Sequence, residues 1–480
     1  MVTLQLVKNI GNKTVITVIG PIPNVGHSEK CWVSIRTLMT SNKGKVLTGS
    51  SYPILLWMWN FYFSYGYVDD TLAMDEWKKQ ATVNHTKLDF IHRDPSHPRR
   101  SSSNPLEVSI PYGCHHTKLF LIGYSTGRLR VVVHTTNLRY ADVHWKCQGA
   151  FLQDFFLKQP DNEFTTSPFE ETLISYLATY RYVDRRLWHP KGSDLEPCSL
   201  MDQVSKYDFA SAKGVLIPSA PGFHSITTGK GMTSATLWGY QAVQKAIRNH
   251  VPKVSSPTMG SRGGSIVCQF SSIGSLSEKY LKTLWDAWNA TGQGLPRFQF
   301  VYPTHQEIVQ SVEGIRGGGS VPGTCKNVEK PFLQSLWHKW NSSFPTTTKS
   351  RTVNLPLDKG RNVPHIKTYY QVDDEQPSQQ GKTMRWFMLG SHNLSKAAWG
   401  ELQNGARGSI FKVFHWELGI LVSPKTLGVD YLVPFGCQDF LCDPTGVEKA
   451  MCEIPLPYSF RPERYNSRDE PWAVDRSHHP

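Results

Sequence analysis

The sequence lacks the features that mark secreted and zinc-binding proteins. Its nine cysteines are odd in number and form no CxxC pair, so neither a secreted disulfide framework nor a zinc knuckle is indicated. Cys437, Cys442 and Cys452 cluster in the sequence, but no fourth residue has convincing ligand spacing. This cysteine usage predicts a reducing intracellular compartment.

Long apolar runs and a phosphate-binding glycine loop are missing as well. Residues 52–68 are rich in Trp, Phe and Tyr but contain Pro53 and Asn60, and the segment is shorter than the roughly 20 apolar residues of a membrane span. We expect a buried pair of strands there and no membrane association. Residues 317–319 are all glycine but lack the spacing of a phosphate-cradling fingerprint, so we expect a mobile loop.

Acidic residues are comparatively few, 39 against 52 Lys plus Arg, and the net charge is +13. Such a charge favours an anionic partner such as nucleic acid without identifying one. The 480 residues, 39% of them hydrophobic, suffice for the cores of two large domains.

One motif occurs twice. Each copy contains His-x-Lys, an apolar run, a turn, a second apolar run, small polar residues and Asn-Leu, at 116–138 and again at 365–394. A polar residue then opens a further apolar segment, Gln148 in the first copy and Glu417 in the second. The corresponding His, Asn and Gln/Glu positions lie 249, 256 and 269 residues apart. Solenoid repeats are only roughly 20 to 50 residues long, so the period indicates a duplicated domain.

Strand and helix patterns alternate in both halves. Apolar runs predict strands at 14–19, 87–92, 214–218 and 265–270. Residues 167–170, Ser-Pro-Phe-Glu, predict a helix start with Ser167 as N-cap and Glu170 completing a capping box. Two stripes have helical spacing and are expected in the core: Leu281, Leu284, Trp285 and Trp288, and Leu333, Leu336, Trp337 and Trp340.

This alternation predicts an α/β fold with a mostly parallel or mixed sheet in each half. The stretch 185–205 has no clear periodicity and is the candidate boundary. We therefore assign residues 51–185 and 186–480 to two domains and leave residues 1–50 unassigned.

The duplicated motif suits phosphoryl chemistry if the halves pack about a pseudo-twofold axis. On a strand, the His and Lys of each triplet point to one face, while Thr117 and Ile366 pack behind. Two lysines and two asparagines can hold phosphate oxygens, a task otherwise given to Mg²⁺, so we expect no metal or other cofactor. One histidine can attack phosphorus while the other protonates the leaving oxygen and then activates water.

Each histidine needs an acceptor for its far ring nitrogen, and Gln148 and Glu417 are the candidates. A carboxylate raises the basicity of imidazole more than an amide does, so the histidine paired with Glu417 is the better nucleophile. A metal site formed by His115, His116, His134 and His144 is the weaker interpretation, because no carboxylate or cysteine joins them at ligand spacing.

These residues resemble the two His-Lys-Asn motifs of the tyrosyl-DNA phosphodiesterases, a branch of the phospholipase D superfamily in which the usual motif Asp is replaced. The motifs are His116, Lys118 and Asn137, and His365, Lys367 and Asn393. Residues 112–118, 269–276, 391–400, 417–419 and 471–472 also match the family pattern. The resemblance covers residues 105–475, and the first hundred residues match poorly.

The resemblance implies two α/β/α sandwich domains related by a pseudo-twofold axis, with the active site at their interface. It implies that His116 is the nucleophile that forms a phosphohistidine and that His365 is the general acid and then the base. Lys118, Lys367, Asn137 and Asn393 would bind the phosphate. Members of the family orient their histidines across the interface, which would pair Glu417 with His116 and Gln148 with His365.

The implied reaction is metal-independent hydrolysis of tyrosyl and other adducts from the 3′ phosphate of DNA, in the repair of stalled topoisomerase complexes. The expected partners are single-stranded or frayed DNA 3′ ends and a topoisomerase-derived peptide, and the expected protein is a nuclear monomer. Tyr112 is expected to stack on DNA, and Ser271 and Ser272 to contact its phosphates. The alternatives are another phosphodiesterase or nuclease of the superfamily, and a DNA-binding relative without catalysis.

Overall fold

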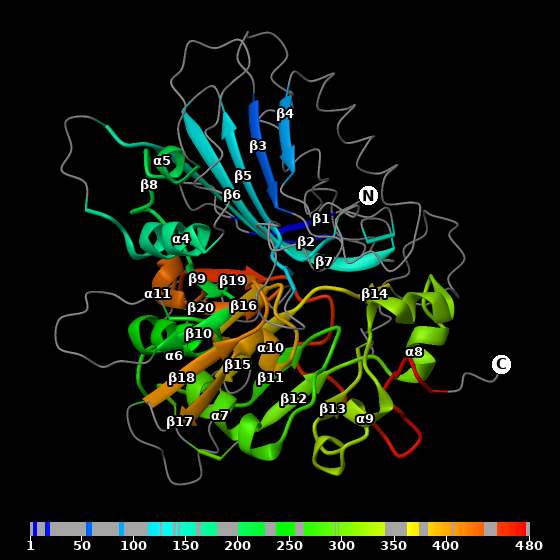
Figure 1. Ribbon diagram of the computed structural model, residues 1–480. Coiled ribbons are helices and arrows are strands. Elements are labelled where there is room, and N and C mark those ends of the chain that lie inside the picture. The colour runs from blue at the N-terminus through cyan, green and yellow to red at the C-terminus, as the bar shows by residue number, and fades with distance from the viewer. Residues whose placement is uncertain are drawn as a thin grey trace.

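The computed structural model describes residues 3–6, 15–19, 54–59, 86–90, 114–124, 127–137, 141–142, 145–159, 165–179, 200–225, 237–254, 264–292, 294–295, 297–340, 362–373, 383–405, 408–435 and 449–476. Within these ranges the strands form two nine-stranded sheets and one three-stranded sheet (Figure 1). Each of the two large sheets contains one copy of the duplicated motif. The sheets together with the helices described below confirm the α/β class.

The first sheet is built around the first copy of the motif. The two apolar runs form an antiparallel hairpin, and the strand that follows Gln148 pairs antiparallel with its second arm. These strands are β5 (Leu119–Tyr124), β6 (Arg128–His134) and β7 (Lys146–Leu157). The remaining strands in the order β1-β2-β7-β6-β5-β3-β4 are β1 (Thr3–Leu6), β2 (Val15–Ile19), β3 (Ile54–Trp59) and β4 (Thr86–Phe90).

The N-terminal part of the chain thus contributes to the first sheet. The strands predicted at 14–19 and 87–92 are present as β2 and β4, and β2 pairs with β7. Of the pair of strands expected in 52–68, β3 is present, and the residues around it lie outside the described ranges.

The second sheet repeats the arrangement around the second copy. Its central hairpin is β15 (Thr368–Asp373) and β16 (Thr383–Gly390), and β19 (Glu417–Val422) pairs antiparallel with β16. The order is β13-β12-β11-β15-β16-β19-β9. The other strands are β9 (Val215–Ser219), β11 (Ile266–Gln269), β12 (Phe298–Val301), β13 (Trp337–His338), β20 (Tyr431–Pro434) and β21 (Met451–Ile454).

Both sheets are mixed, one of the two alternatives predicted, and most of their strand pairs are antiparallel. Two short strands from beyond residue 185 join the first sheet, because β8 (Tyr207–Asp208) and β14 (Val363–Pro364) both pair with β7. The small sheet consists of β10 (Gly222–Ser225), β17 (Glu401–Gly405) and β18 (Gly408–Val413). The boundary at 185–186 lies outside the described residues and stays a prediction.

Helix α4 (Pro168–Ala178) begins as predicted and links the two halves. Ser167 is its N-cap, and the Ser167 hydroxyl accepts a hydrogen bond from the Glu170 amide at 3.2 Å. The Glu170 carboxylate does not complete a capping box but accepts from Lys158 Nζ at 2.8 Å. The helix packs against β9, so its apolar face joins the first half to the second sheet (Figure 1).

Most of the other helices surround the second sheet, and one packs against α4 (Figure 1). They are α5 (Leu200–Val204), α6 (Gly239–His250), α7 (Glu278–Trp288), α8 (His305–Val309), α9 (Cys325–Val328), α10 (Lys396–Trp399), α11 (Pro424–Leu427), and the 3₁₀ turns η2 (Gly314–Ser320) and η3 (Pro331–Leu333). None of the helices in the described ranges is long and apolar enough to span a membrane.

The first tryptophan stripe is a buried helix face, as predicted, and the second is not helical. Trp288 on α7 packs against Trp399 at the end of α10, with 4.9 Å between ring centroids. Trp337 is also buried, but it lies on β13, which pairs with β12 at the edge of the sheet. The i, i+3, i+4 spacing was too short to separate a helix from a turn followed by an edge strand, and Pro331 begins only the short η3.

The expected mobile loop at 317–319 is wrong, because these glycines form part of η2. Gly317 and Gly318 are buried, and a Cβ on Gly318 would lie 2.0 Å from the ring of Trp472. Here glycine serves close packing and not conformational freedom.

Candidate active site

The two His-x-Lys segments lie where the sheets meet, just before the first strand of each motif hairpin. They were predicted on strands, but His116 and Lys118 precede β5, and His365 and Lys367 lie between β14 and β15. The predicted alternation still holds. Thr117 is buried and its hydroxyl contacts the Tyr176 hydroxyl, while the Ile366 side chain is also buried.

Each segment bonds to the backbone of the opposite half. The His116 amide donates to the Trp416 carbonyl at 2.9 Å, and the His365 amide donates to the Cys147 carbonyl at 2.9 Å. The acceptor in each case is the residue just before Glu417 or Gln148. This exchange across the interface therefore brings each histidine to the orienting residue of the other half.

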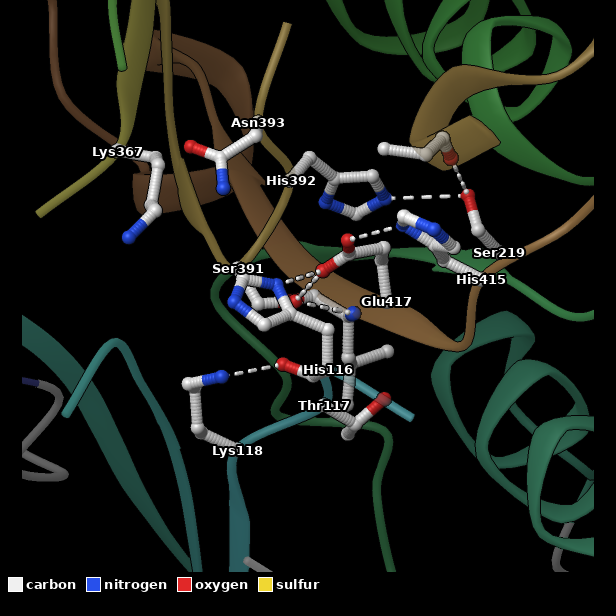
Figure 2. Close-up of polar contacts among 12 residues, drawn as sticks. His116, Thr117, Lys118, Ser219, Lys367, Ser391, His392, Asn393, His415 and Glu417 are labelled. Carbon is white, nitrogen blue, oxygen red and sulfur yellow. Dashed lines mark hydrogen bonds and ion pairs between the residues drawn. The ribbon is translucent and has the colours of Figure 1, made fainter. Parts of the chain in front are cut away.

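The side-chain pairing agrees with that expected from the resemblance. Nδ1 of His116 lies 2.8 Å from Oε2 of the buried Glu417 (Figure 2), and Nδ1 of His365 lies 3.1 Å from Oε1 of Gln148. Donation from Nδ1 leaves the Nε2 lone pair of each ring directed away from its orienting partner. The catalytic roles of these residues stay predictions.

A hydroxyl supports each orienting residue. Thr135 Oγ1 donates to Oε1 of Gln148 at 2.8 Å, and Ser391 Oγ donates to Oε2 of Glu417 at 2.5 Å. These two residues occupy the same place in the repeat, two positions before the motif asparagine. The sequence showed only small polar residues there, although their equal spacing from Asn137 and Asn393 was a usable signal.

The motif lysines are buried and point back onto their own segments. Lys118 Nζ donates to the His116 carbonyl at 2.7 Å, and Lys367 Nζ donates to the His365 carbonyl at 2.5 Å. Burial lowers the pKa of Lys118 to about 8. Burial and the neighbouring Lys118 charge also hold the pKa of Lys367 well below its usual value. Two cations desolvated side by side favour an anionic ligand.

The motif asparagines are held by different means. Oδ1 of Asn393 accepts from the backbone amides of Ser271 and Ser272, at 3.2 and 3.1 Å, and from the Ser271 hydroxyl at 3.3 Å. These contacts leave the NH₂ group of Asn393 as the donor toward a ligand. Nδ2 of Asn137 lies 3.4 Å from Nε2 of His365, and its backbone amide donates to Asp142.

Ser271 and Ser272 thus position Asn393, a role that the sequence did not suggest. Ser271 is buried, and its predicted phosphate contact, like that of Ser272, stays a prediction. Tyr112 lies outside the described residues.

Both motif histidines are electrostatically biased toward the neutral form. Burial lowers the pKa of His116, Glu417 opposes this effect, and the lysine charges add to it, with a net value of about 4. Burial and the nearby lysines hold the pKa of His365 well below its usual value. The pKa of Glu417 is also well below normal despite its burial, because His116, His415 and His392 favour the carboxylate.

Among the described residues, no group of three or more His, Cys, Asp or Glu side chains could hold a metal ion. His144, Cys437 and Cys442, which the metal interpretations required, lie outside those residues. The described site contains imidazole, amide and ammonium groups. Figure 2 shows Lys118, Lys367 and Asn393 on one side of the His116 ring, an arrangement that can surround a phosphate and offer it a nitrogen nucleophile.

Comparisons with known proteins identify a family. The family model for tyrosyl-DNA phosphodiesterase matches residues 33–466. Tyrosyl-DNA phosphodiesterase 1 of Arabidopsis thaliana is 30% identical over 404 residues, 77% of this chain and 60% of the plant protein. Its Drosophila melanogaster counterpart is 24% identical over 472 residues, 94% of this chain and 71% of the fly protein. The chain therefore spans less than two thirds of the plant relative.

A crystal structure of the yeast tyrosyl-DNA phosphodiesterase has the same fold. It matches with a TM-score of 0.59 at 16% identity, over 92% of this chain and 96% of the yeast chain.

Proposed function

The chain belongs to the tyrosyl-DNA phosphodiesterase family, and we propose that it hydrolyses the bond between a DNA 3′ phosphate and a tyrosyl or other adduct. The observation that carries this proposal is the exchange of orienting residues, His116 with Glu417 and His365 with Gln148. It gives two chemically different histidines around one set of lysines and asparagines. A two-step displacement at phosphorus needs two such groups.

In the first step, Nε2 of His116 attacks phosphorus and the bond from phosphorus to the tyrosyl oxygen breaks. His365 gives its proton to the departing oxygen, and the DNA remains attached to His116 as a phosphohistidine. Glu417 stabilises the positive charge that the His116 ring acquires, because its carboxylate accepts the Nδ1 hydrogen at 2.8 Å. Lys118, Lys367, Asn137 and Asn393 hold the non-bridging oxygens.

In the second step, His365 takes a proton from water, and the resulting hydroxide attacks phosphorus while the bond to His116 breaks. The products are a DNA 3′ phosphate and the original enzyme. His365 must be protonated in the first step, although burial and the lysine charges lower its pKa in the free site. A bound phosphate offsets those charges and so raises the pKa of His365 when the substrate is present.

The proposed substrate suggests the cellular setting. A tyrosyl group on a DNA 3′ phosphate is the product of a stalled topoisomerase, so we place the protein in DNA repair and in the nucleus, acting as a monomer on single-stranded or frayed 3′ ends. The net charge of +13 supports a DNA partner.

The test is incubation with a single-stranded oligonucleotide that carries a 3′ phosphotyrosine, in excess EDTA. We expect release of tyrosine and a 3′-phosphate end, because Lys118 and Lys367 take the place of a metal. A 5′-phosphotyrosine oligonucleotide and the His116→Asn variant are the matched controls and should give no product. If correctly folded protein releases no tyrosine, or cuts only internal phosphodiesters, the proposal fails.

A further inference from the structure

Each orienting residue has two terminal atoms, and in both halves the second atom is also held. In the first half, Oε1 of Gln148 accepts hydrogen bonds from His365 and Thr135, while its Nε2 donates to the Asp142 carbonyl at 3.3 Å. In the second half, Oε2 of Glu417 accepts hydrogen bonds from His116 and Ser391. The remaining oxygen, Oε1, lies 3.5 Å from Nδ1 of His415 (Figure 2).

We propose that His415 is a positioning residue of the reaction, which holds the second oxygen of Glu417 and places a positive charge beside it. This assignment rests on the proposed function of the site. None of the motif positions includes His415, but it precedes Glu417 by two residues, and both side chains meet at the start of β19.

The position of His415 is itself fixed. Its backbone amide and that of Phe414 donate to the Ala397 carbonyl on α10, at 3.0 and 3.1 Å. The backbone at His415 is therefore anchored to α10. The Glu417 carboxylate cannot rotate away from His116 without losing its contact with the His415 imidazole. Hydrogen bonds to Oε2 alone, from His116 and Ser391, would constrain the carboxylate less.

The titratable groups that face His415 are Cys114 from the segment before β5, His392 from the segment after β16, and Glu417 on β19. Burial lowers the pKa of His415, but its interactions with Cys114 and the Glu417 carboxylate outweigh burial and raise the pKa to about 10. His415 is therefore a cation at neutral pH. Its charge partly offsets Glu417 and helps His116 to remain neutral in the free site.

The change His415→Gln keeps a polar side chain but removes the charge, so Glu417 raises the pKa of His116 more strongly. We expect that pKa, and with it the acid limb of kcat/KM, to rise by about one pH unit. His415→Arg keeps the charge and should leave both values unchanged. The matched control is His338→Gln, a histidine on β13 at the opposite edge of the second sheet.

Two measurements separate this inference from the proposed function. A histidine-specific NMR titration, assigned with His116→Asn, reads the pKa of His116 in the resting protein and needs no activity. The pH profile of kcat/KM on the 3′-phosphotyrosine oligonucleotide reports the same pKa during catalysis. If the parent releases no tyrosine, the proposed function fails while the titration still decides the role of His415. The inference is overturned if His415→Gln leaves the His116 pKa unchanged, or if kcat/KM falls equally at every pH.

Discussion

Replacing Glu417 by Gln tests the proposed mechanism most directly. The substitution keeps the shape of the side chain and the oxygen that accepts from His116 and Ser391, at 2.8 and 2.5 Å. It removes the negative charge from a buried position. The other half of the molecule already uses Gln148 at the equivalent place, but there the amide nitrogen donates to the Asp142 carbonyl, whereas the new amide nitrogen would face Nδ1 of His415.

The expected loss can be estimated from the charge. When His116 attacks phosphorus its ring becomes cationic, and an opposite charge within about 4–6 Å stabilises such an ion by about 1–3 pKa units. The middle of that range corresponds to about 2.7 kcal/mol, or about a hundredfold in the rate of the first step. The second step begins from a ring that is already linked to phosphorus, and its expulsion needs the carboxylate less.

The assay is single-turnover release of tyrosine with enzyme in excess, which isolates the first step. We expect the Glu417→Gln rate to fall about a hundredfold, with a thermal midpoint close to that of the parent. A first-step rate within threefold of the parent would mean that Glu417 does not stabilise the developing charge. Gln148→Asn, which withdraws the partner of His365, serves as the comparison and should instead slow both proton transfers.

Three further outcomes are expected. His365→Asn should slow breakdown of the phosphohistidine, so intact-protein mass spectrometry should find DNA attached to His116; lost activity without this adduct contradicts the assigned roles. The value of kcat/KM should fall below about pH 4, where His116 is protonated, and again as the pH rises through the lowered pKa of His365, which must donate a proton; a flat profile across either limit contradicts the electrostatics. Gly318→Ala should destabilise the fold by about 1–3 kcal/mol because its Cβ meets Trp472. Gly319→Ala is the control, since a Cβ there meets nothing within 4 Å. Calorimetry that finds the two variants equally stable refutes the packing argument.

Much of the candidate site could be predicted from the sequence because its two copies have the same order of residue types. The motif lysines, histidines and asparagines recur at nearly constant separation, and the hairpins between them follow from apolar runs broken by turn residues. The basicity argument also favoured the histidine paired with Glu417 as the proposed nucleophile, because it depends on functional groups and not on distance. These features are local or repeated, and so a sequence displays them.

The remaining features depend on contacts between distant segments, and only the tertiary structure decided them. His116 and Glu417 are 301 residues apart, and their contact depends on each His-x-Lys segment bonding to the opposite half. The holding of Asn393 by Ser271 and the contact of His415 with Glu417 arise in the same way. Trp337 is a case in which a local pattern misled. Its stripe has helical spacing in the sequence, but pairing with β12 places it on a strand. The sequence determined the chemistry of this protein, and packing across the interface determined which groups act on each other.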